Sequence, residues 1–498
     1  MELPFEKTVC RHWRQKLYTL VRQEETQELK LPEAMPDVGR IIAAWGQTVI
    51  RGKDWHDTGA GISGGVLVWM LYAPEDGGAL QRIESWIPFQ SRVDFPERGD
   101  SGVLRVEGIL RCVDARSISG RKIQFRAGIG LLVQALEPAE TEIPVPGELP
   151  DDVEQLRRSY PVNLIREAGE KSFLLEEDVE LPSGLPEPEK LIYYRLDPEI
   201  LEEKVLGSRA VFRGAGKLHL LYQDESGRLT GYDCEIPFAQ YMELEREYEA
   251  EAALSTLCAV TSLELEQRSG GGLLLKCGLT GQYTVEDTLK IELLEDAYSP
   301  CRSVSLEKSA LELPAWVDSR RELLSLGQSF PADGTRVVDQ IFCPDLPVLT
   351  ECSGMASMEY GGTFQTVLQN ADGGYAGKTL RDSQTAQWKT ECATVPFSIP
   401  RGTAICRREG SLWRTETQVV ADLRSLCETP METVSGVELG EETAPDPERP
   451  SVIIRRMGDQ ESLWELARDC GSTVGAIRRL NRLEGEPDDD RLLLIPVV

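Results

Sequence analysis

The sequence predicts a mainly β, multidomain fold, in which three tandem β-rich units precede a small C-terminal βααβ module. Three observations lead to this prediction. A hairpin-like stretch recurs three times, a second landmark recurs upstream of it with the same period, and residues 451–498 differ in character from the rest. A period near 150 residues is a domain length, too long for a solenoid repeat. The chain is therefore expected to be a tandem array.

The recurring stretch consists of two apolar segments joined by an acidic turn that contains glycine. Apolar runs bounded by such turn signals favour a β-hairpin, because glycine adopts a positive φ at little cost. The three copies, each with its turn and its closing tripeptide, are 66–96 (turn 74–78, Ile-Pro-Phe at 87–89), 218–246 (turn 224–227, Ile-Pro-Phe at 236–238) and the looser 365–401 (turn 370–374, Val-Pro-Phe at 395–397 after a longer second arm).

The upstream landmark is Leu-Pro-x-x-x-Pro, at 31–36 and again at 181–186. Its offset is 150 (181 − 31), and that of Ile-Pro-Phe is 149 (236 − 87). The third unit follows at 159 (395 − 236) and lacks a clean copy of this landmark. The prolines of this landmark exclude a regular helix and an interior strand at 31–36 and 181–186.

These landmarks divide the chain into five parts. The expected parts are a first unit with an N-terminal lead-in over 1–150, a second unit over 151–300, a divergent third unit over 301–434, an acidic proline-containing linker over 435–450 and the terminal module over 451–498. Within this scheme, residues 1–30 show helix-like spacing of apolar residues. The proline-rich and acidic 137–152 predicts a linker, and 295–300 predicts a turn-rich exit from the second unit.

The composition limits the expected partners and the expected cellular location. The chain has 83 acidic and 54 basic residues and a formal net charge of −29, which repels nucleic acid phosphates and anionic lipid. We expect no nucleic acid partner. No segment approaches the ~18–20 apolar residues that span a bilayer, and the first residues lack the apolar region of a secretory signal. These observations predict no transmembrane segment, a cytoplasmic protein, and reduced, partly buried cysteines.

Residues of types that can catalyse a reaction or bind a metal do not form a recognisable site in the sequence. His12, His56 and His219 lack metal-ligand spacing, and the glycine-rich segment 59–65 is expected to be a flexible loop. The repeated aromatic residues are expected to pack in the core or across strands; they are Trp69, Tyr72, Phe89, Tyr222 and Phe238. We therefore expect a protein that is not an enzyme, with no catalytic residues, no metal and no cofactor.

The terminal module has clear local signals. Ser462 and Glu465 form a capping box, which starts a helix that ends at Gly471. Thr473 can cap a second helix over 474–481. Strands are expected at 452–455 and 492–495.

This module resembles the LysM family. The matching residues are Gly458, Asp459, Ser462, Leu463, Trp464, Ala467, Thr473, Val474, Ile477, Leu480, Asn481, Leu494, Ile495 and Pro496. It departs from the family in two loops: Gln460 and Glu461 split the usual Gly-Asp-Thr-Leu-Trp run, and 486–490 replaces a Pro-Gly-Gln turn.

In the family these loops line an N-acetylglucosamine groove. The resemblance therefore implies partner or glycan contacts at Gly458, Asp459, Gln460, Glu461, Ser462, Leu463, Trp464, Asn481, Asp488, Asp489 and Asp490. Three adjacent carboxylates favour a basic protein partner, with a merely solvated acidic run as the alternative. Trp464 could belong to the helix core or to the contact surface, and we favour the core.

The three units resemble SPOCS domains, on the strength of Pro36-Asp37, the Ile-Pro-Phe arms and residues 295–299, Glu-Asp-Ala-Tyr-Ser. SPOCS units followed by a LysM module are the arrangement of SipL-like spore-coat morphogenesis proteins. The resemblance implies a non-enzymatic scaffold in endospore coat assembly, located in the mother cell at the outer forespore surface. Its LysM module would dock a coat morphogenetic, SpoIVA-like ATPase or other coat proteins. The alternative is a peptidoglycan-binding cell-wall or cortex protein.

Overall fold

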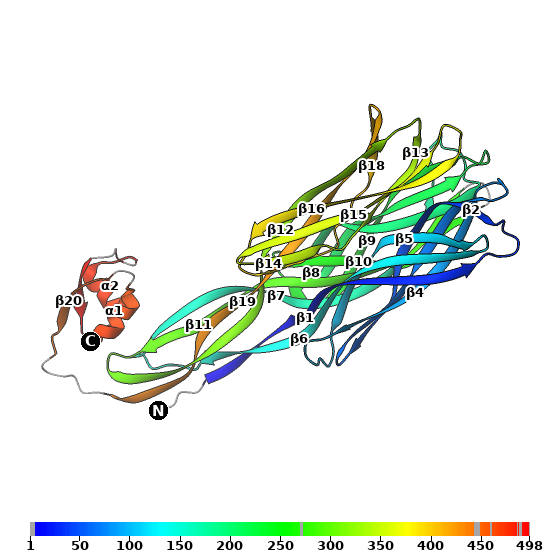
Figure 1. Ribbon diagram of the computed structural model, residues 1–498. Coiled ribbons are helices and arrows are strands. Elements are labelled where there is room, and N and C mark those ends of the chain that lie inside the picture. The colour runs from blue at the N-terminus through cyan, green and yellow to red at the C-terminus, as the bar shows by residue number, and fades with distance from the viewer. Residues whose placement is uncertain are drawn as a thin grey trace.

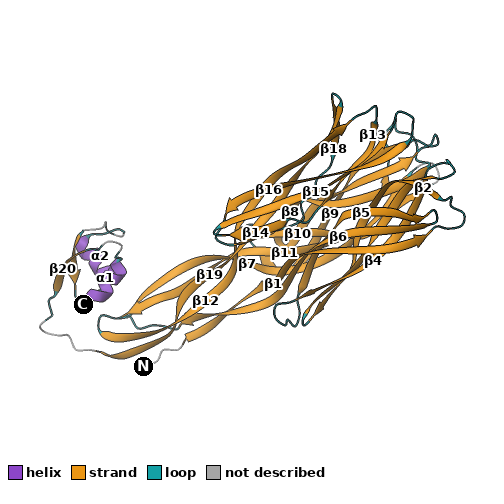
Figure 2. Ribbon diagram, in the orientation of Figure 1, coloured by secondary structure: helices purple, strands orange, loops and turns teal. Residues whose placement is uncertain are grey.

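The computed structural model describes residues 5–268, 272–442, 449–458, 461–485, 487 and 491–497. The prediction of a mainly β, multi-sheet protein is confirmed. Within these residues the strands form six sheets, and the two helices are short and lie in the C-terminal module (Figures 1 and 2).

Residues 5–146, called unit 1 below, form two packed sheets. The strands are β1 (Phe5–Lys30), β2 (Val38–His56), β3 (Gly59–Pro74), β4 (Gln81–Asp94), β5 (Val103–Ser119) and β6 (Lys122–Pro146). The first strand pairs antiparallel with the last along its whole length, and β5 pairs with the other edge of β6. The sheet β2-β3-β4 packs on β5 and β6 through one apolar core.

Residues 154–298, called unit 2, repeat this scheme. The strands are β7 (Glu154–Val179), β8 (Lys190–Gln223), β9 (Leu229–Tyr248), β10 (Ala253–Gln267) and β11 (Leu273–Tyr298). Again the first strand pairs with the last, because β7 runs antiparallel to β11, and β10 takes the other edge of β11. β8 pairs with β9 and covers the positions that β2 and β3 occupy in unit 1.

Residues 302–442, called unit 3, repeat it with more interruptions. The strands are β12 (Arg302–Pro331), β13 (Arg336–Pro344), β14 (Val348–Cys352), β15 (Met355–Gln369), β16 (Tyr375–Lys389), β17 (Ala393–Pro396), β18 (Ile405–Glu409) and β19 (Leu412–Glu442). β12 pairs with β19. Two short strands, β17 and β18, pair with β19 at the place that one long strand takes in the other units.

The two landmarks that recur in the sequence are in contact in the fold. The Tyr72 hydroxyl donates to the carbonyl of Pro36 at 2.9 Å, and the Tyr222 hydroxyl donates to the carbonyl of Pro186 at 2.9 Å. Each hairpin therefore rests on the proline-containing turn that precedes it. The predicted hairpin turns are present in all three units, with a positive-φ glycine in each at Gly77, Gly227 and Gly373.

The three units close into a ring through equivalent edges. Arg82 of unit 1 donates to the carbonyl of Leu191 in unit 2 at 2.8 Å. Gly231 of unit 2 lies against Val338 and Asp339 of unit 3, and Gly377 of unit 3 lies against the carbonyl of Ile42 in unit 1. A side chain at either glycine would collide with the neighbouring strand. Each unit thus uses one edge toward the next unit and another toward the previous one, as in a cyclic head-to-tail assembly.

The long outer strands of the three units extend together into a stem, at the narrow end of the body in Figure 1. β1 and β7 join the strands of units 1 and 2 into one six-stranded sheet through the pair Trp13↔Ile165. The apolar core of the stem combines all three units; its buried members are Cys10, Ile143, Val162, Leu164, Ile291, Leu293, Leu311, Leu313 and Met431.

Several sequence-based expectations for these outer strands are wrong. Residues 5–30 are a strand rather than a helix-like lead-in, because β6 pairs with them throughout. The expected linker at 137–152 is strand as far as Pro146, and the expected exit at 295–300 is strand as far as Tyr298. The expected linker at 435–450 is strand as far as Glu442, because Val437 and Leu439 are buried against Val434 in the stem.

Two further expectations fail in the inner sheets. Residues 59–65 begin β3 instead of forming a flexible loop, since Gly64 and Gly65 leave room for the rings of Phe89 and Trp86. The Val-Pro-Phe of the third copy does not lie in the second hairpin arm, which ends with β16. Its valine and proline belong to β17, in another sheet. The repeated aromatic residues are buried as expected.

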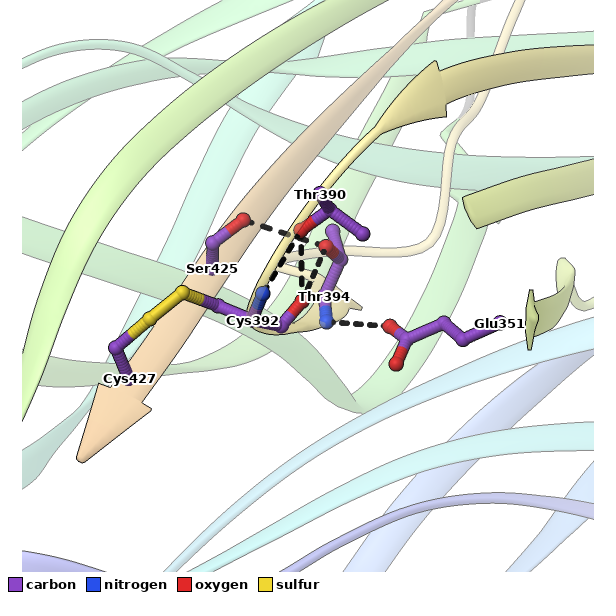
Figure 3. Close-up of a disulfide and its surroundings, with 6 residues drawn as sticks. All are labelled: Glu351, Thr390, Cys392, Thr394, Ser425 and Cys427. Carbon is purple, nitrogen blue, oxygen red and sulfur yellow. Dashed lines mark hydrogen bonds between the residues drawn. A yellow bond between two sulfur atoms is a disulfide. The ribbon is translucent and has the colours of Figure 1, made fainter. Parts of the chain in front are cut away.

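The cysteines agree with their prediction except at one pair. Ten carry free thiols, but Cys392 and Cys427 are joined by a disulfide with a Cα–Cα distance of 5.2 Å (Figure 3). The two residues are 35 positions apart, and the pairing of β17 with β19 brings them together.

The C-terminal module has the element order strand, helix, helix, strand. The elements are β20 (Val452–Arg456), α1 (Leu463–Cys470), α2 (Val474–Asn481) and β21 (Leu492–Pro496). Both halves of the Ser462–Glu465 capping box are formed, and Gly471 ends α1 with a positive φ. Thr473 caps α2 as its sequence predicts.

Candidate functional site

One face of α1 is seated on the end of β11. Trp464 and Arg468 lie one helical turn apart and so share a face. The indole Nε1 of Trp464 donates to Asp296 Oδ2 at 2.8 Å, and Arg468 Nη1 donates to the same oxygen at 2.7 Å. A single carboxylate of unit 2 thus anchors the module.

Tyr298, two residues further along β11, completes this contact. Its ring meets Trp464 edge to face, with centroids 4.8 Å apart, and its hydroxyl donates to the carbonyl of Ser472 at 3.0 Å. Edge-to-face aromatic pairs are favourable beyond the area they bury. Tyr298 belongs to the apolar core of the module itself, together with Leu463 and Ile477, and burial raises the pKa of its phenol.

The stem holds this end of β11 in place. Asp296 Oδ1 accepts from the Ala297 amide at 3.0 Å, and Ser299 donates to Asp152 at 2.8 Å. Arg302 donates to both oxygens of Asp152, at 2.7 and 3.0 Å. Burial opposes ionisation of Asp152, but the bonds from Ser299 and Arg302 outweigh it and lower the pKa. The segment 295–299 is therefore a docking point within the chain, a role that its sequence does not indicate.

The sequence-predicted site residues divide into three groups. Leu463 is fully buried, and Asn481 bonds the backbone of Leu494 through both its side-chain atoms, so these two residues hold the module together. Ser462 caps α1, and Glu461 bonds the amide of Gly458 at 2.9 Å. Trp464 contacts the stem, in addition to packing against the module core.

The remaining predicted site residues lie outside the described residues. They are Asp459, Gln460, Asp488, Asp489 and Asp490. The partner or glycan contacts expected from these two loops stay a prediction.

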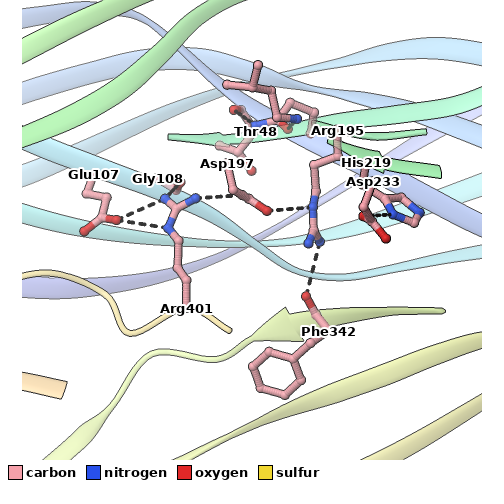
Figure 4. Close-up of polar contacts among 11 residues, drawn as sticks. Thr48, Glu107, Gly108, Arg195, Asp197, His219, Asp233, Phe342 and Arg401 are labelled. Atoms are coloured by element: carbon pink, nitrogen blue, oxygen red, sulfur yellow. Dashed lines mark hydrogen bonds and ion pairs between the residues drawn. The ribbon is translucent and has the colours of Figure 1, made fainter. Parts of the chain in front are cut away.

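A second polar site, which the sequence did not indicate, lies where the three units meet (Figure 4). Arg401 of unit 3 donates to Glu107 of unit 1 at 3.0 Å and to Asp197 of unit 2 at 2.8 Å. Arg195 forms an ion pair with Asp197 at 2.8 Å and donates to the carbonyl of Phe342 at 3.2 Å. Burial opposes ionisation of Asp197, but Arg195 and Arg401 outweigh it and lower its pKa.

His219 lies beside this cluster, between two carboxylates. Its Nδ1 is 2.7 Å from Asp233 Oδ1 and its Nε2 is 2.9 Å from Asp339 Oδ1. Burial disfavours the charged ring, but Asp339 and Asp233 outweigh burial and raise the pKa of His219 to about 9. The imidazolium therefore joins unit 2 to unit 3 at neutral pH.

The cluster opens into a cavity of about 1540 Å³ between units 2 and 3. Among the charged side chains that line it, most of those from unit 2 are acidic, including Glu199, Glu202 and Glu203, and most of those from unit 3 are arginines. Burial raises the pKa of Glu203 to about 7. Charges of opposite sign on facing walls hold the units in register.

Comparison with known proteins identifies no relative: no family model, no curated protein and no solved structure matches the chain. None of the helices in the described part of the chain is long or apolar enough to cross a membrane. Within the same residues, no three His, Cys, Asp or Glu side chains are grouped as a metal site would need.

Proposed function

We propose that the chain is a non-enzymatic scaffold of the endospore coat, with SPOCS-like units that support a LysM-like module. In this proposal it acts in the mother cell at the outer forespore surface, as SipL-like proteins do. Its C-terminal module docks a coat morphogenetic, SpoIVA-like ATPase. The observation that carries the proposal is the contact of Trp464 and Arg468 with Asp296, because it fixes the small C-terminal module at the tip of the stem.

The seated module keeps an apolar face uncovered, and this face suits a protein partner. Val452, Ile454, Leu492 and Leu494 point to one side of the β20–β21 ribbon, because their positions alternate along paired strands. Ile454 and Leu492 are 63 % and 59 % exposed with the module in place. Exposed aliphatic patches mark interaction surfaces when several such residues are contiguous.

The charge of the module differs from that of the body. Residues 449–498 contain eight arginines and nine acidic residues, whereas the whole chain has a net charge of −29. An apolar patch on this nearly neutral module can approach a protein partner with less long-range charge repulsion than the strongly acidic chain as a whole. In a coat layer, several weak contacts of this kind would gain strength from their proximity.

Co-precipitation from sporulating cells tests the proposal. The full chain, the chain without 451–498 and the variant Ile454→Asp are compared, with Leu323→Asp as a control at an exposed leucine of β12. We expect the coat ATPase with the full chain and the control, and its loss from the truncated chain and from Ile454→Asp. Equal recovery from the truncated chain would sink the docking role.

The peptidoglycan alternative has its own measurement. Retention of the full chain on purified peptidoglycan at moderate salt, lost on removal of 451–498, would favour a cell-wall or cortex protein. The proposal expects no such retention.

A further inference from the structure

The segment 393–404, called the strap below, leaves unit 3 and enters the junction of the three units. It begins as β17, which pairs with β19 through four residues, Ala393 to Pro396. The amide of Phe397 then donates to the carbonyl of Asp422 at 2.8 Å, and the strap separates from β19 after this bond.

Unit 1 binds the start of the strap through Tyr18 and Arg105. The Tyr18 hydroxyl donates to the carbonyl of Pro396. The Phe397 ring lies between two guanidinium groups, 5.1 Å from Arg105 and 4.2 Å from Arg424. Cation–π contacts of this kind are strengthened by burial, and Arg105 is only 1 % exposed.

The strap then reaches the charged cluster. The amide of Ile399 donates to Glu107 at 2.7 Å, and Arg401 bonds Glu107 and Asp197 as described above. Tyr360 donates its hydroxyl to the carbonyl of Pro400 at 2.6 Å. One short segment without a long strand of its own therefore carries contacts to units 1, 2 and 3.

The disulfide lies at the start of this segment. Cys392 directly precedes β17, and Cys427 directly follows the β19 residues with which β17 pairs (Figure 3). Thr394 adds two bonds: its amide donates to Glu351 at 2.8 Å, and its hydroxyl bonds that of Ser425 on β19 at 3.2 Å. Both cysteines are half-buried and so open to a thiol from solution.

We propose that the Cys392–Cys427 disulfide is a reducible latch, which holds the strap and through it keeps unit 3 packed on units 1 and 2. A dithiol reductant breaks the S–S bond by transferring two electrons and two protons. Cys392 and Cys427 become thiols, and the dithiol closes to its own disulfide. The strap is then retained by the four β17 pairs, by the bonds of Thr394 and of the Phe397 amide, and by its contacts at the junction.

Three buried cysteines near the junction do not compete for this bond. Burial raises the pKa of Cys258 and of Cys277 to about 12, and that of Cys343 to about 11. Thiols with such values are almost wholly protonated at neutral pH, and only the thiolate attacks a disulfide. These three buried thiols therefore do not attack the disulfide.

Hydrogen exchange of the full chain, followed by mass spectrometry with and without dithiothreitol, tests the latch. We expect amides in 397–402 to exchange on the order of 100-fold faster after reduction, because a disulfide of this loop length removes much of the freedom of the open chain. Cys392→Ser should exchange at the fast rate in both conditions. Cys406→Ser, which changes a free half-buried cysteine inside the same loop, should keep the dependence on reductant.

Three results would overturn the proposal. The first is equal exchange of 397–402 in oxidised and reduced protein. The second is an acceleration by dithiothreitol in Cys392→Ser as large as in the unchanged chain. The third is the absence of a cross-linked peptide joining Cys392 to Cys427 in protein purified under oxidising conditions.

Discussion

The interface between units 1 and 2, called the aromatic joint below, and the interface between units 2 and 3, called the charged joint, use equivalent residue positions. Aromatic rings occupy these positions in the first, and charged side chains occupy them in the second. At the first, Trp45 stacks on Tyr193 at 5.1 Å and Trp69 meets Tyr193 edge to face at 5.4 Å. The residues 150 positions after the two tryptophans are Arg195 and His219. At the second interface these two residues face unit 3, where Asp339 lies 146 positions after Tyr193.

The backbone shows that these positions are equivalent. Ala43 pairs with Leu71 after a register shift, and Asp339 pairs with Val367 after the corresponding shift. The strand geometry is thus retained while an aromatic trio is replaced by an arginine, a histidine and an aspartate. The closed arrangement of the three units is therefore set by which strand edges meet. The side chains at each joint set how much that interface contributes to stability and which conditions weaken it.

The largest effect is expected at the aromatic joint. Trp69→Ala should lower the free energy of unfolding by about 3–5 kcal/mol, because it removes a fully buried ring and leaves a cavity beside Tyr193 and Tyr194. Urea unfolding followed by circular dichroism measures it. Trp55→Ala is the matched control, since Trp55 is only partly buried and its ring lies tilted against that of Phe95 within unit 1. A cost no greater than that of the control would contradict the role of Trp69 in the joint.

The next effect is expected at the charged joint. Arg401→Met keeps an unbranched apolar side chain but leaves Glu107 and Asp197 without their shared partner. Breaking a buried ion pair costs about 3–5 kcal/mol. Because Arg401 is 23 % exposed, we expect a loss of about 2–3 kcal/mol in the same unfolding measurement.

The control for this change is Arg381→Met. Arg381 bonds Asp345 but is 73 % exposed, and exposed pairs contribute about 1 kcal/mol or less. Equal losses for the two variants would show that the three-unit junction is no firmer than a surface ion pair.

The sequence predicts the parts of this comparison that are local. Hairpin turns with Gly77, Gly227 and Gly373 follow from composition alone, as does the capping box of α1. The pairing of Phe5 with Pro146 does not, because nothing local indicates a partner so far along the chain. Trp13 and Leu17 have helix-like spacing and are only partly buried, so β1 lacks a clear strand alternation.

The charged joint escaped prediction for a different reason. The Val-Pro-Phe of the third copy sets an offset of 159, whereas the structural offset between units 2 and 3 is 146 at the hairpin turn (373 − 227). With the wrong offset, Asp339 is not aligned with Tyr193. Asp296 and Tyr298 belong to the 295–299 motif, but only the folded chain brings α1 to them.

The smallest effect concerns pH and acts on the charged joint alone. The pKa of His219 is raised to about 9, above its ordinary value of about 6.5 in an unfolded chain. Its contribution to stability is therefore fully present below pH 6.5 and is lost as the pH rises through 9. We expect the free energy of unfolding of unit 3 to fall by about 2 kcal/mol between pH 6.5 and pH 9.5, measured by urea midpoints at each pH.

Asp339→Asn should flatten this dependence on pH, because His219 then lacks the carboxylate that contributes most to stabilising its positive charge. If this variant shows the same slope of stability against pH as the unchanged chain, other groups cause the pH effect. The two joints would then differ in their side chains but not in their response to pH.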